Sequence, residues 1–191
     1  MIEKIRSFIA VEIPEEVRQK LREVLRELRG SGAEVKWVHP EGIHVTLKFL
    51  GETNRETLEA LSAVLRPLAA GFAPFEVKAQ GLGCFPSLRN PRVVWVGLAE
   101  ERGALSELQR GIETAAAGFG FPPEERPFKP HLTLGRVRSS KGKIPLIQVI
   151  ERNAGLGLGS FRSEQVILFR SDLRPGGAVY SKIEEFQLKR I

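Results

Sequence analysis

Apolar and polar positions recur with two different periods along the chain, and each change of period marks an expected element. A period near 3.6 residues runs over 15–28, 55–70 and 102–117, where leucine, isoleucine and valine form a single stripe. Stripes with this spacing predict amphipathic helices. A shorter helix is expected over 144–153.

Shorter apolar stretches between these helices have a period of two, which is typical of strands. Strands are expected over 6–13, 35–38, 43–50, 75–82, 92–98, 132–137, 163–171 and 179–188. Strands and helices are mixed along the chain, and the strands are not expected to be joined mainly by parallel crossover connections. The pattern therefore predicts an α+β fold.

The pattern His-x-Thr-Leu occurs twice, at 44–47 and at 131–134, separated by 131 − 44 = 87 residues. The two copies use two of the three histidines and two of only five threonines, so coincidence explains them poorly. Each copy follows a strand, a helix and a loop. We therefore expect residues 1–191 to form a single domain of two duplicated lobes, with two mainly antiparallel sheets facing each other across a central cleft and helices outside.

Within each copy, alternation places the histidine and the threonine on the same face of the strand. In the first strand that face carries His44, Thr46 and Lys48, whereas Phe49 is expected on the core side. Lys48 is therefore a candidate contact for an RNA phosphate. A single His-x-Thr on a strand is most often a structural pair, but two copies facing each other would offer two imidazoles and two hydroxyls to one substrate.

Two imidazoles suit acid–base catalysis of phosphodiester displacement. The ordinary pKa of histidine, about 6.5, allows one ring to accept a proton and the other to donate one near pH 7. Hydroxyl groups can hold the charged non-bridging oxygens of the phosphate. This chemistry requires neither a metal ion nor a cofactor.

Composition narrows the class of protein. The chain has 191 residues, of which 42% are hydrophobic, and a formal charge of +6 that favours polyanionic partners. No apolar run approaches the roughly 18 residues of a membrane span, and the single cysteine, Cys84, fits a reducing cytoplasm. Asp172 is the only aspartate, so the carboxylates that usually form a metal-dependent phosphoesterase site are scarce.

The two motif segments resemble a known family. HVTLKFLG at 44–51 and HLTLGRV at 131–137 are similar to the paired motifs of the 2H phosphoesterase superfamily. The stretches RSFIAVEIP, GLGCFPSLRNPRVVWVG and LFRSDLRPGGAVYSKIEEF resemble segments of its RNA 2′,3′-cyclic phosphodiesterases, also called 2′-5′ RNA ligases. The resemblance covers nearly the whole chain.

This resemblance implies a two-lobed fold and hydrolysis of RNA 2′,3′-cyclic phosphate ends to 2′-phosphates without metal or ATP. It assigns His44 as the acid that protonates the 3′ oxygen and His131 as the base that takes a proton from water. Thr46 and Thr133 are assigned as hydrogen-bond donors to the phosphate. Arg136 matches a basic position that the family uses near the terminal phosphate. Strict alternation would place Arg136 opposite His131, so a bulge or a strand end is required there.

The expected partner is RNA with 2′,3′-cyclic phosphate ends, including tRNA halves that the reverse reaction would join through a 2′-5′ linkage. The protein is expected to be a cytoplasmic monomer. Small cyclic nucleotides remain an alternative substrate. A non-catalytic nucleotide- or RNA-binding module that keeps the same cleft is the alternative function, although the intact histidines and threonines count against it.

Overall fold

The computed structural model describes residues 3–100, 102–175 and 177–189. Its elements, in chain order, are β1 (Lys4–Glu12), α1 (Glu15–Gly30), β2 (Val35–Trp37), the 3-10 turn η1 (Pro40–Gly42), β3 (His44–Asn54), α2 (Arg55–Ala70), β4 (Phe75–Ser87), β5 (Asn90–Ala99), α3 (Ala104–Ala117), β6 (His131–Val137), α4 (Lys143–Arg152), β7 (Gly157–Ser163), β8 (Gln165–Arg174) and β9 (Gly177–Gln187). Among the residues described, no helix is both long enough and apolar enough to cross a membrane.

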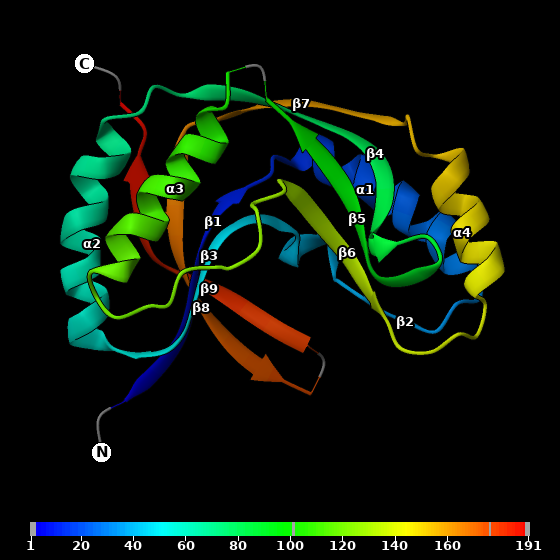
Figure 1. Cartoon of the computed structure of the whole chain (residues 1–191), viewed down its shortest axis with the longest axis horizontal. Helices are drawn as coiled ribbons and strands as arrows, with labels where there is room; N and C mark the ends of the chain where they lie inside the picture. Colours follow the sequence, from blue (N-terminus) through cyan, green and yellow to red (C-terminus); the bar gives the residue numbers. More distant parts are fainter. Residues whose placement is uncertain (1–2, 101, 176, 190–191) are drawn as a thin grey trace.

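The strands form two antiparallel sheets (Figure 1). The four-stranded sheet has the order β3-β1-β8-β9, and the five-stranded sheet has the order β2-β6-β5-β4-β7. The first His-x-Thr-Leu motif lies in β3 and the second in β6, so each sheet carries one copy. Strands β3 and β6 contact each other across the space between the sheets. The predicted α+β fold with two facing antiparallel sheets is therefore confirmed.

The helices lie on the outer sides of the two sheets, in pairs that do not follow the order of the chain. Helices α2 and α3 cover the four-stranded sheet, whereas α1 and α4 cover the five-stranded sheet (Figure 1). Helix α1 follows β1 of the four-stranded sheet yet packs on the other sheet, and α3 makes the opposite crossing from β5. Neither half of the chain therefore builds a complete lobe by itself.

Most helix and strand limits agree with the hydrophobic pattern. Helix α2 spans the predicted range, and Asn54 caps it by accepting a hydrogen bond from the Thr57 amide at 2.7 Å. The strand expected over 163–171 is β8, which runs from Gln165 to Arg174, and β7 before it was not expected. Strand β7 escaped prediction because its glycines, which include Gly159 at φ 103°, interrupt the alternation.

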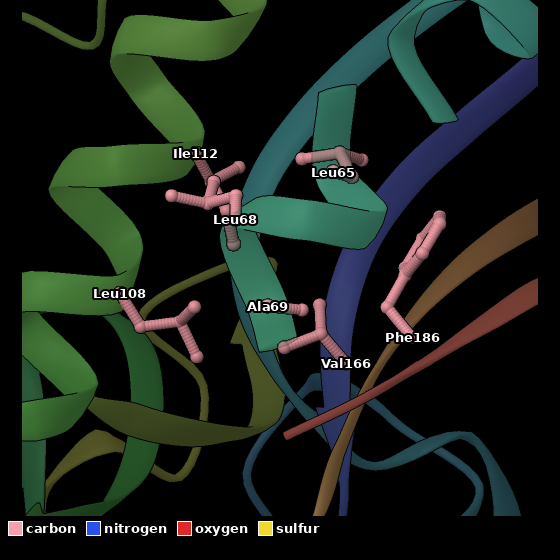
Figure 2. Close-up of a pocket in the computed structure, with 7 residues that line it drawn as sticks. All are labelled: Leu65, Leu68, Ala69, Leu108, Ile112, Val166 and Phe186. Carbon is pink, nitrogen blue, oxygen red and sulfur yellow. The ribbon is translucent and has the colours of Figure 1, made fainter. Parts of the chain in front are cut away.

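The packing of α2 against α3 closes the outer side of the four-stranded sheet. Figure 2 shows side chains from both helices meeting residues of β8 and β9. The residues that meet there are Leu65, Leu68, Ala69, Leu108, Ile112, Val166 and Phe186. Leu65 is 2% exposed, and its neighbour Val64 on the same helix is 42% exposed.

Replacing Leu65 by alanine should lower the free energy of unfolding by about 2–5 kcal/mol, because the loss of a buried side chain leaves a cavity between the two helices. Val64→Ala, on the exposed side of α2, should change it by less than about 0.5 kcal/mol. Urea denaturation followed by circular dichroism measures both. Equal losses in the two variants would contradict this packing.

Candidate active site

His44 is the first residue of β3, and the turn before it orients its ring. The Nδ1 atom lies 2.8 Å from the carbonyl oxygen of Gly42. A carbonyl oxygen can only accept, so Nδ1 carries the hydrogen and the neutral ring keeps its lone pair on Nε2. Arg18 of α1 holds the turn in place by donating to the carbonyl oxygen of Pro40 at 2.6 Å.

His131, the first residue of β6, is held in the same way. Its Nδ1 atom donates to the carbonyl oxygen of Lys129 at 2.6 Å. The ring of Phe85 from β4 meets its face edge-on, with centroids 5.0 Å apart. Each motif histidine thus has its Nδ1 bonded to the backbone two residues earlier and its Nε2 available for chemistry.

Each motif has a bulge at its leucine. In β3, Thr46 pairs with Ala10 and Lys48 with Ile9, so Leu47 has no partner of its own on β1. In β6, Thr133 pairs with Trp95 and Gly135 with Val94, so Leu134 is likewise the extra residue. An extra residue reverses the alternation that follows it. The residue five positions after each histidine therefore comes to the face of that histidine.

The bulge in β3 contradicts two predictions. Lys48 does not share the face of His44: its side chain points into the core, is 6% exposed, and donates to Glu113 Oε2 and to the carbonyl oxygen of Pro122, both at 2.6 Å. Lys48 is therefore not a substrate contact. Phe49, expected in the core, is 63% exposed on the cleft side for the same reason.

Arg136 can share the face of His131 only if the strand has a bulge between them, and β6 has that bulge. It brings this exposed side chain to the face of His131, and the positive charge of Arg136 contributes to a lowered pKa of that histidine. Burial raises the pKa of Tyr180 on β9, while Arg6 and Arg136 act on it in the opposite direction. Arg6 and Arg136 belong to different sheets, and strands β3 and β6 of these two sheets contact each other.

Burial makes both motif histidines poor proton acceptors in the free protein. It lowers the pKa of His44 to about 4, although the hydrogen bond to Gly42 acts in the opposite direction. Burial also lowers the pKa of His131 below its usual 6.5. Both rings are therefore neutral at pH 7 before a ligand binds, although the ordinary pKa of histidine would have allowed one of them to be charged.

An aromatic pocket adjoins His44 on the cleft side of the four-stranded sheet. The ring of Phe8 stacks on the imidazole with centroids 4.6 Å apart, and the ring of Tyr180 meets it edge-on at 5.2 Å. The pocket has a volume of about 180 Å³. Its lining consists of Arg6, Ser7, Phe8, Phe49, Gly51, Ser171, Leu173, Ala178 and Tyr180.

Phe8 and Arg6 belong to the site although the motifs do not point to them. The signal that places them there is long-range: β1 pairs directly with the motif strand, with Phe8 opposite Phe49. Within the described ranges, no three His, Cys, Asp or Glu side chains lie close enough together to hold a metal ion.

Comparison with known protein families identifies the family of this chain. The family model described as LigT like Phosphoesterase matches the chain twice, over residues 11–95 and 96–180. Each match contains one His-x-Thr-Leu motif. The chain belongs to the LigT-like phosphoesterase family. The resemblance to 2H phosphoesterases seen in the motifs is thereby confirmed.

Relatives of this LigT-like phosphoesterase extend over nearly its full length. A protein of Methanothermobacter thermautotrophicus named RNA 2′,3′-cyclic phosphodiesterase is 38% identical, with 97% of this chain and 100% of the relative covered. A Thermus thermophilus protein of the same name is 37% identical, with 97% and 91% covered.

Solved structures agree with the fold. A crystal structure of a Thermus thermophilus protein has a TM-score of 0.81 and 33% identity, with 97% of this chain and 98% of that chain covered. The structure of Escherichia coli LigT complexed with 3′-AMP has a TM-score of 0.80 and 26% identity, with 98% and 100% covered.

Titration of the histidine ring signals by NMR should show both motif histidines with a pKa below 6.5, and His44 near 4. Urea-unfolded protein, in which the rings are in water, should titrate near 6.5. Because the unfolded chain binds these protons more tightly, their stabilising contribution should be complete above pH 6.5 and be lost as the pH falls toward 4. A His44 midpoint near 6.5 in the folded protein would show that its ring is not desolvated.

Proposed function

We propose that this LigT-like phosphoesterase hydrolyses 2′,3′-cyclic phosphate ends of RNA to 2′-phosphates. The observation that carries the proposal is the pair of imidazoles on facing strands, each with Nδ1 bonded to a backbone carbonyl and each followed by a threonine on the same face. The relatives named RNA 2′,3′-cyclic phosphodiesterase support the substrate class.

In the proposed reaction, water attacks phosphorus and the bond to the 3′ oxygen breaks. Nε2 of His131 takes a proton from the water, and Nε2 of His44 gives a proton to the departing 3′ oxygen. The products are a 2′-phosphate and a 3′-hydroxyl group. Because the pKa of His44 is about 4 in the free protein, His44 must gain its proton as substrate binds. The negative phosphodiester and the carbonyl of Gly42 both favour that charged form.

Thr46, Thr133 and Arg136 are assigned to the non-bridging oxygens. The two hydroxyl groups lie on the same faces as the two imidazoles, and Arg136 reaches this face through the bulge in β6. These donors would stabilise charge that grows on the oxygens in the transition state. The mechanism assigns no role to a metal ion or another cofactor, since the imidazoles move both protons.

The aromatic pocket accommodates the terminal nucleoside. In this assignment His44 protonates the 3′ oxygen, so the ribose that carries this oxygen lies on the His44 side of the phosphate. The exposed face of Phe49 and the ring of Tyr180 then offer stacking surfaces to the base. Stacking depends little on base identity, so the pocket favours RNA ends of varied sequence.

The same site can also join RNA ends. A 5′-hydroxyl group of a second RNA would attack phosphorus in place of water, with His131 taking its proton and His44 protonating the departing 3′ oxygen as in hydrolysis. The product would be a 2′-5′ linkage, as in the joining of tRNA halves. Water is present at much higher concentration, so hydrolysis should dominate.

We also propose that the two halves of the chain arose by duplication. Both motif strands have a histidine bonded through Nδ1 to the backbone two residues earlier, and both have a bulge at the leucine of the motif. The double match to one family model supports the same interpretation.

The function is tested by incubating the protein, with excess EDTA, with a short RNA that ends in a 2′,3′-cyclic phosphate. The expected result is conversion to the 2′-phosphate, resolved chromatographically from the 3′-phosphate. Binding of the RNA without conversion would indicate a non-catalytic binding module. Activity that appears only after metal is added would overturn the metal-free mechanism.

His44→Ala and His131→Ala are the matched controls for this assay. Each should reduce turnover on the order of 10²-fold or more, because each removes one of the two proton-transfer groups. Circular dichroism and urea denaturation show whether both variants remain folded. Normal turnover in both would eliminate the His-pair mechanism.

Phe49→Ala should raise KM for the RNA about 5- to 100-fold, since the loss of one stacking surface costs about 1–3 kcal/mol per base. Turnover at saturation should change little, because the proton-transfer groups are untouched. Ile144→Ala is the control: this side chain is 71% exposed on the outer helix α4, and its loss should leave KM unchanged. An unchanged KM in Phe49→Ala would place the base elsewhere.

A further inference from the structure

Lys48 forms a buried ion pair that neither the proposed chemistry nor simple packing explains. Its ammonium lies 2.6 Å from Glu113 Oε2, and the two side chains are 5% and 17% exposed. Desolvation offsets much of the attraction in such a pair, and apolar residues of similar size often stabilise a core equally well. A role in geometry accounts for the pair better than a role in stability.

The pair belongs to a network around the bulge in β3. Gln109 of α3 donates to Glu113 Oε1 at 3.2 Å and to the carbonyl oxygen of Leu47 at 3.4 Å. Leu47 is the bulged residue, and Lys48 is the next one. Helix α3 therefore contacts both Leu47 and Lys48, the residues at the bulge that brings Phe49 to the cleft side.

The third partner of Lys48 belongs to the segment that leads to the second motif. Residues 118–130 connect α3 to β6 without helix or strand, and they pass from the outer side of the four-stranded sheet to the five-stranded sheet (Figure 1). Lys48 donates to the carbonyl oxygen of Pro122 within this segment at 2.6 Å. At the far end of the segment, the Leu98 amide donates to the carbonyl oxygen of Pro130 at 3.2 Å. The segment is thus tied to one sheet near its start and to the other at its end.

The corresponding position in the second motif has no such group. Gly135 follows the bulge in β6, and a Cβ atom there would lie 2.6 Å from Val35 Cγ1 and 2.7 Å from the ring of Trp37. Strand β2 covers that side: it pairs with β6, and its side chains Val35 and Trp37 pack against Gly135. The link between the two motif strands therefore starts from β3, through Lys48.

We propose that Lys48 is a positioning residue: through Glu113 and the Pro122 carbonyl, it sets the location of His131 relative to His44. This inference rests on the proposed hydrolysis. The reaction needs the base and the acid on opposite sides of phosphorus, and a displacement near 1 Å costs on the order of 10²-fold in rate. Substrate binding depends mainly on groups that Lys48 does not contact.

The test compares Lys48→Met, the double variant Lys48→Met/Glu113→Leu, and Lys20→Met as a control on the exposed side of α1. In the double variant no buried charge is left unpaired, so its urea midpoint should return close to that of the wild type. Its kcat should nevertheless stay about 10- to 100-fold low, with KM within about threefold. Lys20→Met should match the wild type in every measurement.

The NMR signal of the His131 ring provides a readout that does not need activity. In both Lys48 variants this signal should shift relative to the wild type, whereas Lys20→Met should leave it in place. A stable double variant with wild-type kcat and an unshifted His131 signal would overturn the positioning role. Failure of the wild-type protein to hydrolyse cyclic ends would instead overturn the proposed function, and the His131 signal would still decide the role of Lys48.

Discussion

The one-residue bulge at the leucine of each His-x-Thr-Leu motif is the constraint on which the site depends. A regular strand would leave histidine and threonine on the cleft side but send the residue five positions after the histidine into the core. The extra leucine reverses this order, so Phe49 lines the aromatic pocket and Arg136 comes to the face of His131. The same reversal turns Lys48 inward, where it pairs with Glu113. One local irregularity thus determines which side chains line the candidate site and which are buried in the scaffold.

The bulge acts together with the hydrogen bonds of the two histidine rings. Each Nδ1–H···O=C bond is local, since donor and acceptor are two residues apart, and it fixes the tautomer before any substrate is present. Burial then keeps both rings neutral in the free protein. In the proposed reaction, His44 would therefore gain its proton together with the anionic substrate, so that it protonates a leaving group only when a phosphodiester is bound.

Much of the fold could be predicted because its signals are local. Stripes such as that of α2 and the alternation around both motifs depend only on neighbouring residues. The two His-x-Thr-Leu copies likewise made His44, Thr46, His131 and Thr133 the candidate site residues from the sequence alone, and the fold brings the two strands that carry them into contact. The wrong faces predicted for Lys48 and Phe49 share a cause. Alternation assumes a regular strand, whereas β3 has a bulge where it pairs with β1 and contacts α3. The aromatic pocket was missed because three separate segments of the chain form it.

The crossed arrangement of the helices bears on how the protein can form as it is synthesised. Helix α1 emerges early, but the sheet on which it packs is completed only by β4 to β7, which follow much later in the chain. The four-stranded sheet is likewise completed only when β8 and β9 have been synthesised, and β9 brings Tyr180 beside His44. An N-terminal half released from the ribosome would expose two unpaired apolar faces. The pocket is therefore assembled last, and a prematurely terminated chain carries a motif strand without a working cleft.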